Sequence, residues 1–416
     1  MSTTGGNRFG TPFRPLLVAS LVAGGTLFAA CESETPSGQP DGTDDGTVED
    51  GEGRADADAD VDVVGDADSS AEAEAEAEAD AEAGADTDVA DEGEVPVPCE
   101  PLATDYQPRT GTDDWPACIS DDNTYHSIGA SISTVARIAA FEQIADLLWR
   151  RATPPGPADF TNARVSYTET NGLDSRVQRR EDLHVPAVPA ADGACTDAGV
   201  PDLYPDRCVG PARILPILNQ AFADGTAGTD PLVNAARIEA ALLWFLYLSP
   251  YKESNTCTDT PADCDSAWAY YTGGEDRSAG LGLASYVSDL DAATHDRVWD
   301  GLLAIRCWKN LDNETGVSTD TATRDRARAQ MDCALIRGVA LIVRDRLDDL
   351  RAATTDEERR AKLEFVKILG GVLDREAEAR DPANAAILRG ELGRSDPATV
   401  DIDAAQEAID LLFPCP

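Results

Sequence analysis

The sequence predicts an all-α protein, a multi-helix bundle stapled by disulfides and preceded by a disordered acidic tether. Apolar residues recur with helical spacing through most of residues 125–413. Convincing alternation of apolar and polar residues, the pattern of a β-strand, is absent. Nine cysteines follow residue 98 in a chain that starts with the pattern of an export signal. Cysteines in exported chains favour disulfides over metal–thiolate sites, so we expect a cross-linked helical domain over residues 99–416.

Residues 1–31 resemble the signal peptide of a bacterial lipoprotein. Two arginines precede an apolar core at residues 15–30, which is the arrangement of an export signal. The segment Leu27-Phe-Ala-Ala-Cys31 is similar to a lipobox, and this implies that Cys31 carries the lipid that ties the chain to a membrane. Glu32 follows where a retained lipoprotein has Asp, which favours the outer membrane and a periplasmic or cell-surface domain. The alternative is an ordinary cleaved signal with an unrelated cysteine.

Residues 32–98 are predicted to be a disordered tether. They contain 25 Asp and Glu residues against the single base Arg54, and they contribute −24 to a total charge of −43. Like charges two and four residues apart repel one another and leave no apolar face to bury. This acidity also argues against nucleic acid as a partner, because a nucleic-acid binder needs basic charge to displace counterions.

The first half of the helical domain is expected to contain five helices and one long Pro-rich loop at residues 185–209. Residues 128–151 carry an amphipathic stripe of apolar side chains at helical spacing. The pair Ser249-Pro250 should end or kink the fifth helix, because proline lacks the backbone donor that a helix interior needs. The expected helices are residues 128–151, 157–168, 173–182, 211–223 and 231–249.

Helical spacing also fits most of the second half. Thr355 followed by three acidic residues is typical of a helix N-terminus. The pair Asp381-Pro382 is another helix start, with proline at a position where its missing donor costs nothing. The expected helices are residues 263–272, 281–289, 292–311, 319–352, 356–379 and 402–413.

The cysteines after Cys31 are expected to pair locally. No two of them have the C-x-x-C spacing of a zinc ribbon or a thioredoxin. Cys99, Cys118 and Cys415 then remain, and one of the three is left over, although spacing alone does not fix the connectivity. The expected pairs are Cys195 with Cys208, Cys257 with Cys264, and Cys307 with Cys333.

One carboxylate, Glu239, stands in an almost unbroken apolar stretch at residues 236–253. Its neighbours three and four positions away are all apolar, so its own helix offers it no cation. Carboxylates that project from several helices into a bundle core can hold iron or another hard cation. The alternative is an arginine from a neighbouring helix, with Arg137 or Arg237 as the partner. The candidate metal ligands are Glu142, Glu239, Glu253 and Glu275.

Several motifs follow one another between residues 125 and 312, namely residues 159–167, 173–176, 237–247 with 251–253, and 265–271 with 273–274. Their order resembles the iron-assimilation family, secreted helical proteins of algae with lipoprotein relatives in bacteria, and the helices after residue 319 lie outside the resemblance. The resemblance implies binding or retention of iron outside the membrane. The long acidic tether and the extra cysteines depart from the family pattern, which makes binding a firmer expectation than uptake.

The function expected from the sequence is therefore that of an outer-membrane lipoprotein whose helical domain binds iron or another hard cation. The rival hypothesis is a metal-free surface scaffold that binds proteins or peptides through exposed Trp268, Tyr270 and Tyr271. An enzyme is not expected, because no histidine lies in a recognisable catalytic motif and no acid–base pair follows from spacing.

Overall fold

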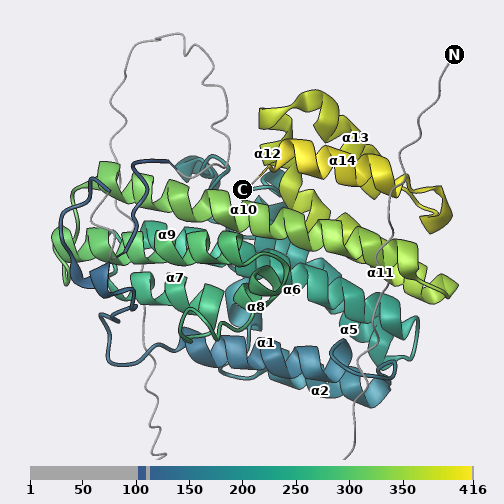
Figure 1. Ribbon diagram of the computed structural model, residues 1–416. Helices are drawn as coiled ribbons and strands as arrows, with labels where there is room; N and C mark the ends of the chain where they lie inside the picture. The colour runs from purple at the N-terminus through teal and green to yellow at the C-terminus, as the bar shows by residue number, and fades with distance from the viewer. Residues whose placement is uncertain (1–101, 109–112, 415–416) are drawn as a thin grey trace, which may run out of the picture. The chain divides into compact units, whose positions relative to one another are not determined.

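The computed structural model describes residues 102–108 and 113–414, and every regular element in these residues is helical (Figure 1). The predicted all-α class is confirmed. The predicted signal peptide, Cys31 and the acidic tether of residues 32–98 lie outside the described residues. Export, lipidation and disorder therefore stay predictions.

Helix α6 (Pro231–Thr256) forms the centre of the bundle. It packs against α5 (Leu215–Thr226), α7 (Ala262–Thr272) and α11 (Asp356–Gly370). Within the described part of the chain, α6 alone is long and apolar enough to cross a membrane, but 83% of its apolar window is buried inside the domain. A helix that is apolar on all sides is a core helix when other helices cover it, so packing accounts for its composition.

Helices α9 (Ala292–Leu311) and α10 (Thr321–Ala352) lie side by side as a helical hairpin next to α6 (Figure 1). Their close approach depends on Gly301, where a Cβ atom would lie 2.6 Å from the Cα atom of Met331. Real Cβ atoms do not approach a backbone atom so closely, so the contact between the two helices requires glycine at this position.

The other helices cover the central ones on two sides. Helices α1 and α2 pack on each other and against α7 and α5, while α13 and α14 pack on each other and against α11 and α10 (Figure 1). Their bounds are α1 (Thr134–Leu148), α2 (Pro157–Thr168), α3 (Asp174–Val177), α4 (Val200–Leu203), α8 (Leu283–Leu290), α12 (Asp374–Arg380), α13 (Pro382–Leu392) and α14 (Ile402–Leu412). Single 3₁₀ or π turns lie at η1 (Ile119–Asp122), η2 (Ala190–Asp192), η3 (Gly210–Ile214), η4 (Gly371–Leu373) and η5 (Pro397–Thr399).

Two helix starts predicted from the sequence are confirmed by their capping contacts. The Thr355 hydroxyl accepts a hydrogen bond from the backbone N–H of Glu358, and the Glu358 carboxylate accepts one from the backbone N–H of Thr355. This reciprocal pair is a capping box. The Asp381 carboxylate caps α13 by accepting from the backbone N–H groups of Ala383 and Asn384.

Several predicted helix boundaries are wrong. The helix expected at residues 128–151 is α1 (Thr134–Leu148), and the one expected at residues 173–182 is only α3 (Asp174–Val177). Helix α6 continues through Pro250 to Thr256 instead of ending at Ser249. A proline inside a helix costs about 3 kcal/mol, but Pro250 itself is buried, and so are Glu253, Ser254 and Cys257 after it, so tertiary contacts hold the last turns of the helix. Packing therefore outweighs the lost hydrogen bond.

A further error concerns the predicted helix at residues 356–379. It breaks into α11, the turn η4 and α12 at the pair Gly370 and Gly371. Two adjacent glycines weaken a helix. A Cβ atom at Gly370 would also lie 2.3 Å from the Leu392 side chain, so α13 packs closely where the helix breaks. The turn η4 and helix α12, which follow the break, form part of the wall of a cavity.

The disulfides are confirmed where the cysteines are close in sequence. The predicted pair of Cys307 with Cys333 is wrong: Cys307 bonds to Cys118, 189 residues earlier, and Cys333 is disulfide-bonded to neither of them. The reason is that η1 packs on α9 and brings Cys118 to the buried Cys307. The confirmed local pairs are Cys195–Cys208 and Cys257–Cys264.

Candidate functional site: a cavity beside helix α6

The partner of Glu239 is an arginine from another helix. One oxygen of the buried Glu239 carboxylate accepts hydrogen bonds from Nη2 of Arg346 on α10 at 2.8 Å and from the Tyr286 hydroxyl on α8 at 2.9 Å. The arginines expected from the sequence are engaged elsewhere, since Arg237 bonds to Glu364 and Arg137 donates to a backbone carbonyl. Glu239 thus takes part in an ion pair between helices.

The other predicted metal ligands are not brought together around a cation. Glu142 pairs with Arg150 and accepts from a backbone N–H, and the buried Glu253 pairs with Arg180 at 3.1 Å. Glu275 is exposed. Residues 102–108 and 113–414 contain no group of three or more His, Cys, Asp or Glu side chains that could hold a metal ion. Iron binding therefore stays a prediction without a site among the described residues.

The aromatic surface expected for a protein-binding scaffold is wrong. Trp268, Tyr270 and Tyr271 are all buried, because α7 lies between α6 and α9. The ring of Tyr125 stacks on Trp268 with 4.5 Å between the ring centroids, which covers the only partly open edge of the set. These aromatic side chains belong to the core, so they offer no contact surface.

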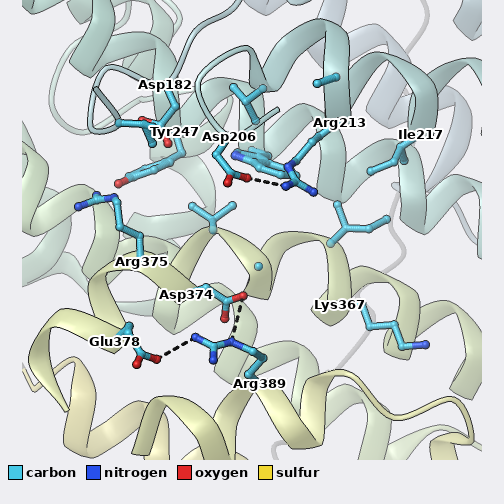
Figure 2. Close-up of a pocket in the computed structure, with 17 residues that line it drawn as sticks. Asp182, Asp206, Arg213, Ile217, Tyr247, Lys367, Asp374, Arg375, Glu378 and Arg389 are labelled. Carbon is cyan, nitrogen blue, oxygen red and sulfur yellow. Dashed lines mark hydrogen bonds and ion pairs between the residues drawn. The ribbon is translucent and has the colours of Figure 1, made fainter. Parts of the chain in front are cut away.

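A cavity of about 770 Å³ lies beside α6, next to Trp244 and Tyr247 (Figure 2). One wall consists of α6, the start of the α5 segment and the loop around residues 182–185, and the opposite wall consists of the end of α11, η4, α12 and α13. Cavities of this size, partly apolar and with a few polar groups, are typical of small-molecule sites. None of the ligand candidates from the sequence lines it.

Tyr247 provides the least satisfied polar group of the cavity wall. Its side chain is only 2% exposed, and its hydroxyl has no hydrogen-bond partner among the residues that the structure describes. Burial, reinforced by the charge of Asp332, raises the pKa of Tyr247 well above the usual value, so the hydroxyl keeps its proton and remains a donor. A buried donor without an acceptor costs about 1–3 kcal/mol, and the protein closes this hydroxyl off from the cavity.

Arg375 on α12 and Lys367 on α11 are the cations of the cavity with the weakest internal partners. The Arg375 guanidinium makes one long bond of 3.4 Å to Glu376, and that carboxylate also binds Arg380 at 3.0 Å. The Lys367 ammonium reaches Glu364 at 3.3 Å, and that carboxylate also binds Arg237. In each case two cations share one carboxylate, and the carboxylates of Asp332 and Asp182 also lie near Arg375.

The acidic residues of the cavity are better matched. Arg213 pairs with Asp206, and Arg389 binds both Glu378 at 3.1 Å and Asp374 at 3.5 Å (Figure 2). Burial raises the pKa of Asp374, an effect that Arg389 opposes. Cations inside the protein therefore already neutralise much of the negative charge on these walls.

His184 fixes the fourth acidic residue, Asp182. Nδ1 of His184 lies 2.6 Å from Asp182 and Nε2 lies 3.2 Å from Asp332. The ring stacks on Tyr251 at 3.7 Å between centroids and faces Tyr247 at 5.9 Å. Burial alone lowers the pKa of His184, but the two aspartates outweigh burial and raise it to about 9. A charged His184 ring therefore packs against the Tyr247 ring and holds it in place.

Reasoning from the sequence missed the cavity residues Tyr247 and Arg375. A tyrosine in an apolar run is indistinguishable from a core aromatic, and an arginine on a polar helix from a surface charge. Comparison with protein-family models, curated proteins and solved structures finds no match to this chain. The resemblance to the iron-assimilation family therefore stays a prediction, and the candidate binding site follows from the geometry of the structure.

Proposed function

We propose that this chain is an exported, lipid-anchored protein of the outer membrane whose helical domain binds a small organic molecule in the cavity beside α6. The export signal pattern and the lipobox-like segment ending at Cys31 support the anchoring. The cavity supports the binding. That the chain is not an enzyme stays a prediction, and we propose no catalytic step.

The observation that carries the proposal is the cavity of about 770 Å³, whose walls combine apolar side chains with a few charged ones. This combination is typical of small-molecule sites, in which apolar surface holds the ligand and a few polar groups orient it. Tyr247 is part of the wall, while its hydroxyl is buried in the protein. Trp244 lies one helical turn earlier on the same wall and adds a flat apolar surface.

A binding screen with a cavity-filling variant tests the proposal. The full chain, purified in detergent, is melted with defined classes of small molecules, namely organic acids, amines, amides and sugars. Ala212 lines the cavity, so Ala212→Trp should fill part of it and abolish any ligand-induced rise in melting temperature. Ala322→Trp is the matched control, because Ala322 is exposed at the start of α10 and does not line the cavity.

We expect at least one class to stabilise the wild type and Ala322→Trp while leaving Ala212→Trp unaffected. Binding to the cavity stabilises the folded state by about 2.7 kcal/mol when the ligand is present at a hundred times its dissociation constant. If no class raises the melting temperature, or if Ala212→Trp responds as the wild type does, the cavity is not a ligand site and the proposal is wrong.

A further inference from the structure

We infer that the cavity takes an uncharged molecule with a flat ring, and that this ring packs against the indole of Trp244. The inference rests on the proposed function. Trp244 is half-buried and lines the cavity from α6. Every other residue of α6 from Ile238 to Pro250 is buried. The packing of the other helices therefore leaves one large aromatic side chain of the central helix partly open, and that side chain lies at the cavity.

The indole of Trp244 is available to a molecule in the cavity. The indole N–H groups of Trp149 and Trp308 donate hydrogen bonds of 2.8 Å to Tyr286 and to a backbone carbonyl. Among the residues that the structure describes, no group accepts a hydrogen bond from Trp244. Aromatic side chains give a large apolar contact area and favour stacking with other rings. Trp244 thus offers a ring of the cavity both a flat surface and a free donor.

Charged side chains form the rim of the cavity, and apolar side chains form its floor. Five of the eight charged residues that line it are exposed, namely Asp206, Arg213, Arg375, Glu378 and Arg389. An ionic contact at such a rim contributes little, because water screens it. A ligand instead gains most where it removes apolar surface from water. The apolar side chains of the lining are all buried or half-buried, namely Val185, Val209, Ala212, Ile217, Trp244, Ile368 and Val372.

The charges of the wall already have partners in the protein. Arg213 pairs with Asp206, and Arg389 pairs with Glu378 and Asp374 (Figure 2). A charged ligand would have to displace one of these partners or enter the apolar floor without a counter-ion, and burying an unpaired charge is costly. The wall therefore selects against ions. The remaining charged residues have partners outside the wall, Glu376 for Arg375, Glu364 for Lys367 and His184 for Asp182.

The backbone of both walls departs from a regular helix at the cavity. The π turn η3 contains Ala212 and Arg213, and the 3₁₀ turn η4 contains Gly371 and Val372, all of which line the cavity. Single π turns next to α-helices are frequent at functional sites. These two interruptions support a built site independently of the side chains.

The test compares matched probes by titration calorimetry on the full chain in detergent, with the heat of titration into detergent alone subtracted. The probes are 2-naphthamide, 2-naphthoate, 2-naphthylmethylamine and the fully hydrogenated amide, which is uncharged but no longer flat. We expect the aromatic amide to bind at least about tenfold more tightly than the acid and the amine, because neither ion finds a free counter-ion. It should bind about twofold to tenfold more tightly than the hydrogenated amide, because only a flat ring stacks on the indole.

The variants assign the effect to Trp244. Trp244→Leu should weaken the aromatic amide by about tenfold and remove its advantage over the hydrogenated amide, whereas Trp244→Phe keeps a flat ring and should lose no more than about threefold. A merely structural Trp244 would instead lower the melting temperature of Trp244→Leu and leave the affinity unchanged. Trp149→Leu is the matched control, because Trp149 is also half-buried but does not line the cavity. It should leave the affinity unchanged.

The outcomes distinguish this inference from the proposed function. The inference alone is overturned if the acid or the amine binds as tightly as the aromatic amide, or if Trp244→Leu binds that amide as the wild type does, while Ala212→Trp abolishes the binding. It is also overturned alone if no naphthyl probe binds and another class binds in the screen. If no compound of any class binds, the inference and the proposed function are both overturned.

Discussion

Removal of the Glu239 carboxylate should destabilise the domain by about 3 kcal/mol, the lower end of the 3–5 kcal/mol that loss of one partner of a buried ion pair costs. The lower end applies because Arg346 keeps other support when Glu239 becomes alanine. Its side chain is 19% exposed, it still donates to Asp349 at 2.9 Å, and it still lies over the Phe365 ring at 4.9 Å. The Tyr286 hydroxyl would also lose an acceptor.

A series of substitutions separates charge from hydrogen bonding. Glu239→Gln keeps an oxygen that accepts from Tyr286 and Arg346 but loses the charge, so it should cost about half as much, 1–2 kcal/mol. The double variant Glu239→Leu with Arg346→Met replaces the pair by apolar side chains, which is often neutral or stabilising. We therefore expect the double variant to be more stable than either single variant, with a coupling energy of about 2 kcal/mol.

Urea unfolding followed by circular dichroism gives these free energies for the full chain in detergent, and each titration is repeated with a chelator. If Arg346 is the partner of Glu239, the chelator should leave the free energy of unfolding of the wild type unchanged. The reasoning would be refuted if Glu239→Ala unfolded within 0.5 kcal/mol of the wild type, which is the usual range of a neutral surface substitution. It would also be refuted if the chelator destabilised the wild type as much as Glu239→Ala does, because a bound cation would then be the partner.

Three further predictions concern other parts of the domain. The pKa of the buried His184 rises from its usual 6.5 to about 9. Its contribution of about 3 kcal/mol to the free energy of unfolding is therefore complete below pH 6.5 and lost as the pH rises through 9. In urea unfolding at a series of pH values, His184→Gln should flatten that decline. Burial, with Asp296 and Asp105 nearby, raises the pKa of Asp300 from 3.8 to about 6 despite Arg277. The folded state then binds the proton more tightly, so the stability of the wild type relative to Asp300→Asn should fall by up to about 3 kcal/mol between pH 3.8 and 6 and stay level above it; a constant difference across this range would contradict the shift. Gly301→Ala should destabilise the domain by about 1–2 kcal/mol in urea unfolding, because overpacking against Met331 exceeds the gain in helix propensity. The control Gly390→Ala has open space at its Cβ position and should stabilise the domain by about 0.5–1 kcal/mol.

The helices could be predicted because their signals are local. Apolar residues at helical spacing locate α9 and α10 closely, and the caps at Thr355 and Asp381 are formed by residues within three positions of each other. The continuation of α6 through Pro250 could not be predicted in the same way. It depends on α5, α7 and α11, which cover the helix and come from distant parts of the chain. Tertiary packing decides such cases, and no local pattern contains it.

The disulfides show the same division. Cys257 and Cys264 are 7 residues apart and close a short turn, which spacing indicates directly. The bond from Cys118 to Cys307 spans 189 residues. The entropy of closing a loop grows only with the logarithm of its length, so a long closure is only slightly worse than a short one once packing brings the two cysteines together. Preference for local pairs is therefore a weak rule in a folded bundle.

Two of the polar side chains in the apolar stretch of α6, Glu239 and Tyr247, differ from what the sequence indicates for them. Glu239, the conspicuous one, is satisfied by Arg346 and Tyr286. A buried charge has to be paired in the fold itself, because an isolated one costs far more than a domain can tolerate. Tyr247 lies eight residues later, and its neutral hydroxyl is the group left without a partner in the described residues. A phenol can stay unpaired at a cost of about 1–3 kcal/mol, so packing can bury its hydroxyl without a partner. In a core helix a charge therefore indicates a pairing with another helix, whereas packing alone decides whether a neutral hydroxyl finds a partner, and only the folded structure reveals the result.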